Sequence, residues 1–306
     1  MTTTLNSSQK SIPLLSPLRY PGSKRRLVGY IKEALELNDL KPSLYIEPFV
    51  GGASVALQLM QEDLVEKVVL MDVDPWISGF WYTVFFDTQW LIDKIETIDV
   101  TLEKWWEFKN SNPTTKREQA LTCFFLNRTS FSGILENRAG PIGGKTQQSQ
   151  YKIDCRFMRE VLINRIKQAS LLKDKVIDVM CCSWLEGIDE IRKLQKLGKL
   201  PSDNLFLYLD PPFFEEAEAL YRHYFTEDDH KGLRDYLLKL NDKFILSYDL
   251  AQQVETLYGI ALKNGTNGTH HDHIELLYSL AKISERKRGK EVIISNLKQL
   301  PKQEGS

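Results

Sequence analysis

The sequence predicts an α/β fold, in which a sheet carries helices on both faces and is interrupted by a mostly helical insertion. Short apolar runs of strand length alternate with amphipathic stretches of helical period. A glycine turn joins the first strand to a helix, and an acidic residue closes the second strand, as in a βαβ unit. We therefore assign residues 12–85 and 171–300 to the sheet domain and residues 86–170 to the insertion.

The composition is that of a globular protein. The chain has 306 residues, of which 42% are hydrophobic and 26% are charged, and its formal net charge is −1. This charge excludes a basic nucleic-acid coat, so any nucleic-acid contact must come from local basic patches. The four cysteines form no CxxC pair, which indicates neither a zinc site nor a disulfide framework. The polar start MTTTLNSSQK lacks a signal core, and no run approaches the ~20 apolar residues of a membrane span. We expect a cytoplasmic protein without a membrane partner.

The first half of the sheet domain contains two strand-like runs and two helical stretches. Gly51 and Gly52 break the chain between the first strand and its helix, and Asp72 and Asp74 follow the second strand. In order, the predicted elements are a helix at 27–37, a strand at 44–47, a helix at 53–59 and a strand at 68–71.

The second half contains the remaining strands. They are predicted at 176–180, 205–209, 244–247, 274–278 and 292–294. Thr226 and Asp229 predict a capping box at the start of a helix between the second and third of these strands. A charged turn, 285–290, joins the last two. We place His270, His271 and His273 in a polar loop, where no cysteine accompanies them, so they do not indicate a metal site.

The run Asp210-Pro211-Pro212-Phe213 follows an apolar strand, at the edge where ligands of open α/β sheets bind. Two prolines stiffen the loop and remove two backbone donors, so carbonyls can point outward beside the Asp210 carboxylate. Such acceptors suit an amino group that becomes positive during attack on an electrophile. Phe213 offers a ring face on which a planar base could stack. The alternative is a strand-ending proline turn with a solvated aspartate.

The turn from Glu47 to Ser54 predicts a ligand site at the first helix. Small residues permit close approach of the backbone, and the helix start presents free N–H groups. It is neither GxGxxG nor a P-loop, so a nucleoside with an amino-acid tail fits as well as a dinucleotide. Asp72 stands about 20 residues beyond the glycines, where an acidic side chain binds ribose hydroxyls. A purely structural turn and a solvated aspartate are the alternatives. Lys24, near a helix start, pairs with a carboxylate or lies on the surface.

A loop rich in Gly, Asn and Gln runs from residue 127 to residue 150. Its basic residues are typical of phosphate contacts, and its amides are typical of base-edge contacts, although such loops are also simply solvated. The candidate DNA-binding residues here and beside it are Arg128, Ser130, Arg138, Lys145 and Lys152.

Taken in order, these motifs resemble the Dam-type (D12 class) DNA adenine N6-methyltransferases over residues 18–297. The matching elements are 20–24, 47–52 with Asp72, 127–133, 210–213, 224–225 and 247–249. Two positions depart from the family pattern. Phe213 replaces the usual tyrosine and keeps only the stacking surface, and Cys181-Cys182-Ser183-Trp184 stands where relatives often carry an acidic residue before an aromatic. The loop also differs from that of members that read GATC.

The resemblance implies a Rossmann-like methyltransferase that transfers a methyl group from S-adenosylmethionine to N6 of a flipped adenine in duplex DNA, leaving S-adenosylhomocysteine. It implies direct transfer without a metal. The residues implied to bind the cofactor are Tyr20, Lys24, Glu47, Pro48, Phe49, Gly51, Gly52, Asp72 and Asp210. The implied catalytic residues are Asp210, Pro211, Pro212 and Phe213. The insertion would recognise the DNA target.

Other acceptors and roles remain open from the residues. Asp210 favours adenine over cytosine N4, RNA adenine or a protein amide, and a catalytically silent DNA-binding relative is a further alternative. The resemblance also implies a prokaryotic or phage-encoded enzyme, either an orphan or one that works with a cognate restriction endonuclease.

Overall fold

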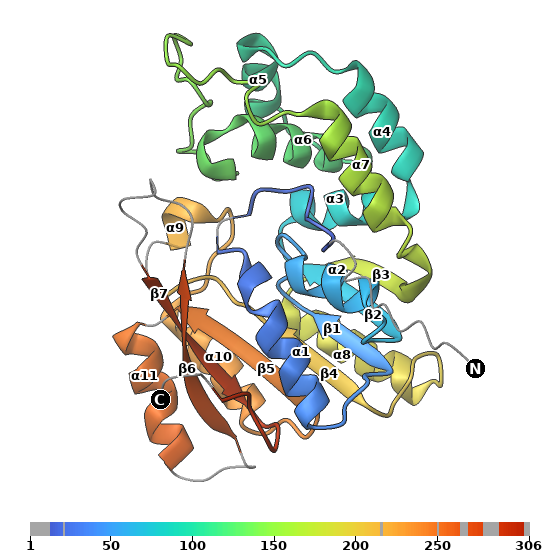
Figure 1. Ribbon diagram of the computed structural model, residues 1–306, viewed down its shortest axis with the longest axis vertical. Helices are drawn as coiled ribbons and strands as arrows, with labels where there is room; N and C mark the ends of the chain where they lie inside the picture. Colours follow the sequence, from blue (N-terminus) through green and yellow to red (C-terminus); the bar gives the residue numbers. More distant parts are fainter. Residues whose placement is uncertain are drawn as a thin grey trace, which may run out of the picture.

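The computed structural model describes residues 13–20, 22–214, 217–249, 251–263, 269–277 and 288–302 (Figure 1). A seven-stranded sheet forms its centre, with the strand order β3-β2-β1-β4-β5-β7-β6. The strands are β1 (Leu44–Glu47), β2 (Lys67–Asp72), β3 (Val176–Cys181), β4 (Leu205–Leu209), β5 (Lys243–Asp249), β6 (His270–Leu277) and β7 (Arg288–Ser295).

The five strands from β3 to β5 are parallel, and β7 runs antiparallel between β5 and β6. β1 is the central strand of the parallel part, with β2 on one side and β4 on the other. All five residues of β4 are buried, as expected for a strand covered on both faces. The carboxyl ends of β1, β2 and β4 therefore meet at one edge of the sheet.

Helices cover both faces of this sheet (Figure 1), which confirms the predicted fold class. In β1, Tyr45 packs with α1 and α2 on one face, while Leu44 and Ile46 pack with α8 and α10 on the other. The alternation follows from the two-residue period of a strand. The helices of the sheet domain are α1 (Val28–Leu37), α2 (Ser54–Gln61), α3 (Pro75–Phe86), α8 (Trp184–Lys196), α9 (Ala217–Leu220), α10 (Glu227–Leu237) and α11 (Gln252–Lys263).

The segment predicted as a helical insertion is helical. It contains α4 (Thr88–Thr97), α5 (Leu102–Lys109), α6 (Lys116–Thr129) and α7 (Arg159–Ser170). α3 packs against both α6 and α7, so a continuous apolar core joins these helices to the sheet. Residues 13–20, which we call the N-terminal strap, pass beneath α6 and α7 before the chain enters the sheet domain (Figure 1).

In the part of the chain that the structure describes, three helices begin with a reciprocal capping box. At α10 the Thr226 hydroxyl accepts from the Asp229 N–H at 3.3 Å, and the Asp229 carboxylate accepts from the Thr226 N–H at 2.8 Å. Two otherwise unpaired N–H groups are satisfied in this way. The predicted box is therefore confirmed. The same arrangement begins α6 at Thr115 and α8 at Ser183.

The prediction that the three histidines lie in a polar loop was wrong. His270, His271 and His273 belong to β6, where His271 pairs with Ile294 and His273 with Val292 of β7. Pairing with the backbone of a buried strand extends β6 through residues whose side chains do not indicate a strand. Of the predicted charged turn, residues 288–290 belong to β7 and residues 285–287 lie outside the described residues.

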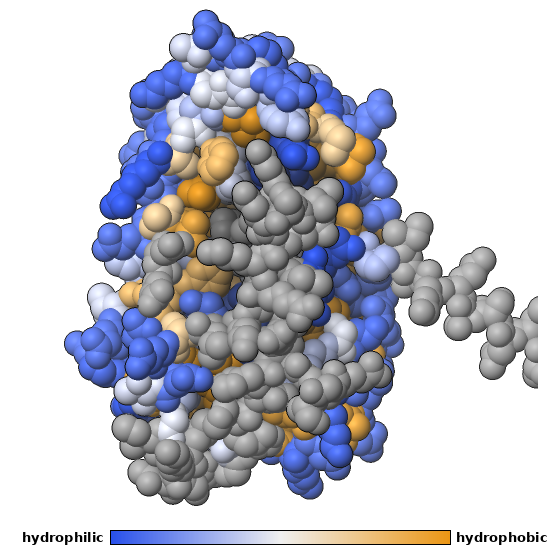
Figure 2. Space-filling view, turned by 60° about the vertical axis from the view of Figure 1, so that its left-hand side comes forward, coloured by the Kyte–Doolittle hydropathy of each residue, from blue (hydrophilic) through white to orange (hydrophobic). Residues whose placement is uncertain are grey.

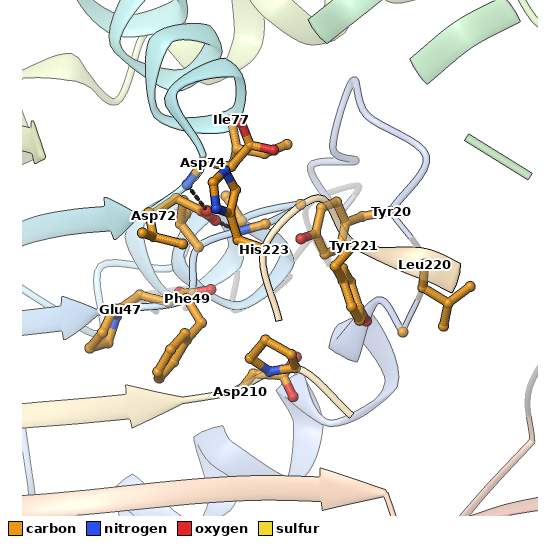
Figure 3. Close-up of a pocket in the computed structure, with 18 of the residues that line it drawn as sticks. Tyr20, Glu47, Phe49, Asp72, Asp74, Ile77, Asp210, Leu220, Tyr221 and His223 are labelled. Atoms are coloured by element: carbon orange, nitrogen blue, oxygen red, sulfur yellow. Dashed lines mark hydrogen bonds between the residues drawn. The ribbon is translucent and has the colours of Figure 1, made fainter. Parts of the chain in front are cut away.

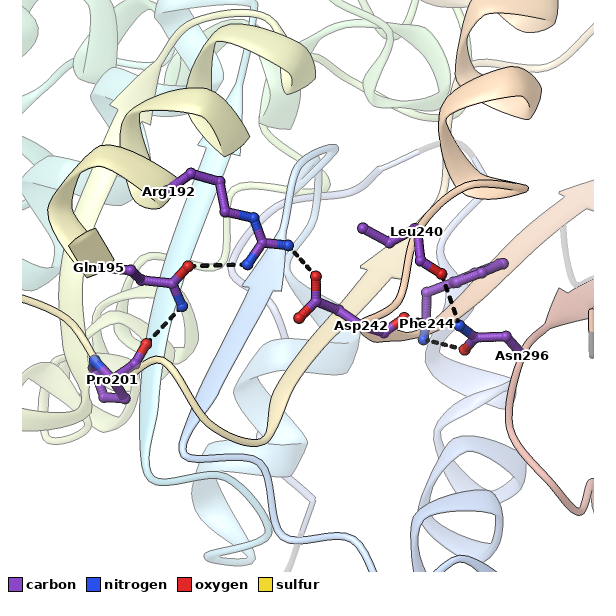
Figure 4. A network of polar contacts seen from close by, with 7 residues as sticks. All are labelled: Arg192, Gln195, Pro201, Leu240, Asp242, Phe244 and Asn296. Carbon is purple, nitrogen blue, oxygen red and sulfur yellow. Dashed lines mark hydrogen bonds and ion pairs between the residues drawn. The ribbon is translucent and has the colours of Figure 1, made fainter. Parts of the chain in front are cut away.

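A polar network fastens the edge of the sheet opposite the carboxyl ends of β4 and β5 (Figure 4). Asn296 is the first residue after β7. Its side-chain amide accepts from the Phe244 N–H at 3.1 Å and donates to the Asp242 carbonyl at 2.8 Å. Asp242 also pairs with Arg192 of α8. The network ties the start of β5 to β7 and to α8.

Within the residues that the structure describes, no helix combines the length and apolar character that crossing a bilayer requires. The same residues contain no group of three or more His, Cys, Asp or Glu side chains that could hold a metal ion.

Candidate active site

A cavity of about 440 Å³ opens at the carboxyl ends of β1, β2 and β4 (Figure 3). This is the edge where open α/β sheets bind their ligands. The cavity brings together every predicted cofactor-binding residue and one residue of the Pro-Pro pair: its walls include Tyr20, Lys24, Glu47, Pro48, Phe49, Gly51, Gly52, Asp72, Asp210 and Pro212.

Asp72 is held by backbone N–H groups at the end of β2. Its Oδ2 accepts from Gly51 and its Oδ1 from Asp74, both at 3.0 Å. These bonds tie the β1–α2 turn to the end of β2. Burial, with Asp74 nearby, raises the pKa of Asp72 to about 7 despite the two N–H donors. A carboxylate fixed in this way can accept hydroxyl protons from a ribose.

Glu47 lies at the end of β1 and is also buried. Its Oε2 accepts from the Tyr45 hydroxyl at 2.7 Å and from the Ala56 N–H at 3.1 Å. Burial raises the pKa of Glu47 to about 8, the Tyr45 hydroxyl opposes the rise, and the nearby Asp210 adds to it. A cationic ligand would favour the ionised form.

The two glycines of the turn are required by Tyr20. A Cβ on Gly51 would lie 2.5 Å from the Tyr20 ring, and one on Gly52 would lie 2.9 Å from the Tyr20 Cβ. Gly51 also has a positive φ of 41°, which glycine adopts most readily. The turn therefore serves close packing of Tyr20 as well as access to the cavity.

Asp210 is oriented by two donors on one oxygen. Its Oδ1 lies 2.9 Å from the Lys24 Nζ and accepts from the Ser247 hydroxyl at 3.0 Å, while the Ser247 hydroxyl also bonds to the Tyr208 hydroxyl at 2.9 Å. Burial raises the pKa of Asp210, and Lys24 and Ser247 oppose the rise. In the described residues both contacts fall on Oδ1, so Oδ2 remains for a ligand.

Lys24 is buried between two carboxylates. Its Nζ lies 2.9 Å from Asp210 and 3.5 Å from Glu291 of β7, and 5.2 Å from the centre of the Phe213 ring. Burial disfavours the ammonium, but the two carboxylates outweigh burial and raise the pKa of Lys24. The sequence allowed a carboxylate or surface role for Lys24. The structure places it in an ion pair with the predicted catalytic aspartate. Glu291, which the sequence reasoning missed, is a buried strand residue with no motif around it.

Phe213 does not line the cavity. Its ring meets Tyr221 edge to face, with centroids 5.8 Å apart, and lies beside Lys24. Pro211 is buried, whereas Pro212 lines the cavity. The structure thus brings Asp210 and Pro212 to the cavity, and places Phe213 beside it.

Aromatic rings support the opposite wall. Phe225 meets Phe49 edge to face at 5.5 Å, and His230 stacks on Phe214 at 3.8 Å. Burial lowers the pKa of His230 to about 4, so the imidazole is neutral, and its Nδ1 is bonded to the Tyr248 hydroxyl at 2.7 Å. These uncharged contacts join the segment after β4, at Phe214, to α10 and β5, at His230 and Tyr248.

Residues 220–225 form a second part of the wall that the motifs only partly indicated. Arg222 reaches across to the start of α3, where its Nη1 lies 2.7 Å from the Asp74 Oδ1 and its guanidinium 3.6 Å from the centre of the Trp76 ring. Tyr221 packs on Tyr20. This part of the wall forms through contacts between residues that are far apart in the sequence. No local sequence pattern therefore predicts the role of Arg222.

The predicted DNA-binding residues divide into two groups. Arg138, Lys145 and Lys152 are exposed on the loop of the helical region. Arg128 and Ser130 are buried instead: Arg128 donates to the Pro17 carbonyl, and Ser130 accepts from the Trp105 indole at 3.0 Å. The structure contradicts direct DNA contact by these two side chains, because both support packing.

An exposed aromatic side chain, which the sequence reasoning did not single out, lies beside the cavity. Phe131 is 67% exposed, in a short turn (η2, Phe131–Gly133) whose Gly133 lines the cavity. Figure 2 shows apolar residues along the middle of the face that is on the left in Figure 1, with hydrophilic residues above and below.

The residues of the cavity fit an adenosyl group with a methionine tail. Asp72 offers its carboxylate to ribose hydroxyls, and Phe49, Phe225 and Trp184 offer ring faces to a planar base. Two carboxylates, the buried Glu47 and the half-buried Asp210, suit a sulfonium and an amino group. Ser183, which lies where relatives often carry an acidic residue, offers a hydroxyl instead of a carboxylate. That hydroxyl is already engaged in the capping box of α8.

The sheet, with helices on both faces and a cavity lined by carboxyl groups at its carboxyl edge, defines a Rossmann-like α/β enzyme fold. Residues 20–292 match the model of the D12 class N6 adenine-specific DNA methyltransferases. The chain belongs to this family, and it is a site-specific DNA adenine methyltransferase whose substrate is duplex DNA.

A curated relative agrees with this assignment. The type II methyltransferase M.MjaIII of Methanocaldococcus jannaschii is 27% identical over 248 residues, which cover 74% of this chain and 80% of that protein. A solved structure described as precorrin 8w decarboxylase of Methanobacterium thermoautotrophicum covers 90% of this chain and 92% of its own at 11% identity, with a TM-score of 0.33. That score is too low to support an argument about fold or function.

Proposed function

We propose that the enzyme transfers the methyl group of S-adenosylmethionine directly to N6 of an adenine that is flipped out of duplex DNA. The orientation of Asp210 carries this proposal. Lys24 and Ser247 hold its Oδ1, which leaves its Oδ2 to accept from an amino group of the substrate. An aspartate prepared in this way can accept an N–H hydrogen bond without first reorganising.

The chain's own residues would then act on the acceptor. Asp210 and the carbonyl of Pro211 accept the two amino hydrogens, which keeps the nitrogen lone pair directed at the methyl donor. The Asp210 carboxylate would stabilise the positive charge that develops on N6, and N6 would then release one proton to solvent, which gives the neutral methylamino group. S-Adenosylmethionine supplies the electrophilic methyl group when bound. No covalent enzyme intermediate is required.

The binding of the cofactor follows from the same cavity. Asp72 binds the ribose, and Glu47 with the turn from Pro48 to Gly52 binds the methionine end. Lys24 holds Asp210 rather than contacting the cofactor alone. Tyr20 closes the cavity above the glycines. S-Adenosylhomocysteine is the product.

The helical region at 86–170 would recognise the DNA target. Arg138, Lys145 and Lys152 are its exposed basic residues and would contact phosphates or base edges. Phe131 offers an apolar side chain beside the cavity that could fill the stack when a base leaves it. A cognate restriction endonuclease is a possible partner that the activity does not require.

The decisive experiment is tritium transfer from labelled S-adenosylmethionine to unmethylated duplex DNA. Wild-type protein should label DNA on adenine N6, and Asp210→Ala should lower kcat by about a hundredfold or more. Thermal unfolding and calorimetric binding of S-adenosylhomocysteine control for folding. Asp203→Ala, at an exposed aspartate before β4, is a matched variant that should retain activity. Label on cytosine would refute the adenine assignment, and an intact variant with wild-type kcat would refute the role of Asp210.

A catalytically silent DNA-binding protein is the competing interpretation. It predicts DNA binding without binding of S-adenosylmethionine. The intact set of Asp72, Glu47 and Asp210 in one cavity favours the enzyme.

A further inference from the structure

Four arginines gather around the N-terminal strap, away from the ion pair of the catalytic aspartate. Arg19 belongs to the strap, Arg128 to α6, Arg156 to the loop before α7, and Arg165 to α7. Arg128 donates its Nε to the Pro17 carbonyl at 2.7 Å, and Arg165 donates to the Ser16 carbonyl at 3.3 Å. We call these four residues the arginine cluster. Arg128 and Arg165 hold the strap through neutral carbonyls, which leave the positive charges of the cluster uncompensated.

The charges of the cluster oppose one another. Burial first, and then the positive charges of the other three members, lower the pKa of Arg128 to about 9. Burial and Arg156 likewise lower the pKa of Arg19. In the ion pairs formed by the described residues, none of the four guanidinium groups takes part. Residues 1–12 contain no Asp or Glu.

One donor of the cluster has no acceptor within the described chain. The Nη1 atom of Arg19 is buried and lacks a hydrogen-bond partner among the described residues. Leaving a buried donor of a charged group unsatisfied is unfavourable. Four neighbouring arginines without a carboxylate partner in the part of the chain that the structure describes, together with an unpaired guanidinium N–H, indicate a binding site for an anion.

The cluster lies beside the mouth of the cavity. The Asn127 side chain accepts from the Arg19 N–H at 2.7 Å and donates to the Arg19 carbonyl at 2.8 Å. Gly133 packs so closely on this carbonyl that a Cβ there would lie 2.3 Å from the oxygen. Both Gly133 and Tyr20, the neighbour of Arg19, line the cavity. A polyanion whose base enters the cavity must pass close to Arg19.

We propose that the arginine cluster binds backbone phosphates of the DNA strand beside the target adenine. The inference rests on the proposed function, and it assigns phosphate contacts to Arg156, which is exposed, and to Arg165, which is half-buried. Arg19, whose Nη1 is buried, adds positive charge beside them. Buried Arg128 strengthens the positive field behind them. Phosphates fit better than base edges, because Arg165 is anchored to a backbone carbonyl and cannot extend into a groove as bidentate base reading requires.

The test uses the full chain with the single variants Arg156→Gln and Arg165→Gln, and the double variant. Their affinities for cognate and unrelated duplexes are measured by fluorescence anisotropy over a range of salt concentrations. Each single variant should weaken binding to all sequences alike, and should reduce the slope of log K against log salt by about 0.9 for each phosphate that the protein no longer neutralises. The double variant should show about twice the reduction of a single variant.

Arg117→Gln is the matched control, because it removes one positive charge from α6 at a residue that is already paired with Asp87. It should leave the salt slope unchanged. Arg165→Lys, which keeps the charge, should restore most of the slope. Calorimetric affinity for S-adenosylhomocysteine should be equal in all variants, which shows that the cavity is intact.

Two outcomes would overturn the assignment. If Arg156→Gln and Arg165→Gln bind DNA with the salt slope of Arg117→Gln, the cluster does not contact phosphates. If they weaken only cognate DNA at an unchanged slope, the cluster reads bases instead. Absence of methyl transfer by wild-type protein that still shows the salt effect would refute the proposed function alone.

Discussion

Asp210 is the residue on which the proposed chemistry depends, and neighbouring side chains orient its carboxylate. Ser247 on β5 donates to Oδ1 and is itself bonded to Tyr208 on β4. Lys24 approaches the same oxygen from the segment before α1. The aspartate therefore sits at the junction of two neighbouring strands, and its orientation is fixed before substrate binds.

Removing the Ser247 hydroxyl should lower the rate without weakening cofactor binding. Ser247→Ala deletes a hydrogen bond to a charged group, which contributes about 1.5–3 kcal/mol, so kcat should fall by roughly ten- to a hundredfold. Ser247→Thr keeps a hydroxyl and should recover part of the rate. Steady-state kinetics and calorimetry with S-adenosylhomocysteine separate the two effects. An unchanged kcat would show that Lys24 alone orients Asp210.

At the scale of elements, Asn296 joins the end of β7 to the segment that leads into β5, two stretches that no local pattern connects. It bonds to Phe244 at the start of β5 and to the carbonyls of Asp242 and Leu240 before it. Because β7 is antiparallel to β5, its end lies beside the beginning of β5 (Figure 4). The network lies far from the cavity edge and serves the sheet.

Asn296→Ala should therefore destabilise the protein while leaving its chemistry intact. Removal of hydrogen bonds to buried backbone groups should lower the free energy of unfolding by about 1–3 kcal/mol. Urea unfolding measures the change, and kcat below the transition should match wild type. Asn137→Ala, at an exposed asparagine, is the control and should have no measurable effect. A stability equal to wild type would mean that water replaces the missing bonds.

The elements also show what sequence could and could not predict. The strands that end in Asp72 and Asp210 were predictable, because short apolar runs followed by polar residues carry a local signal. The strand β6 was missed at its polar beginning, since His270 and His271 owe their conformation to pairing with β7. Arg128 and Ser130 were placed on the DNA because spacing alone does not reveal burial. Arg222 and Glu291 act through partners distant in sequence, Asp74 and Lys24.

At the scale of the whole molecule, three buried carboxyl groups have a pKa that burial raises well above the ordinary value. Burial raises the pKa of Glu47 and of Glu291 to about 8 and that of Asp72 to about 7. Each group keeps a proton in the folded state that the unfolded chain has already released. The folded state therefore loses its advantage as the pH rises through these values.

The free energy of unfolding should fall with pH from the ordinary carboxyl range up to about pH 8, and between about pH 6.5 and pH 8.5 the fall should be about 4 kcal/mol. His230 does not offset the fall in this range, because its pKa of about 4 and its ordinary value of about 6.5 both lie at or below it. Chemical denaturation at several pH values measures the trend. Glu291→Gln removes one of the titrating groups and should flatten it. A stability that rises with pH would contradict this account.

The packing of Tyr20 on the glycine turn has a thermodynamic consequence. Arg19 belongs to the surface assigned to DNA phosphates, and the next residue closes the cavity assigned to the cofactor. The two ligands therefore share one short stretch of backbone, which Asn127 contacts through both the N–H and the carbonyl of Arg19. Ordering that stretch for one ligand lowers the entropic cost for the other. Because such coupling is reciprocal, whatever factor the cofactor adds to DNA affinity, DNA must add to cofactor affinity.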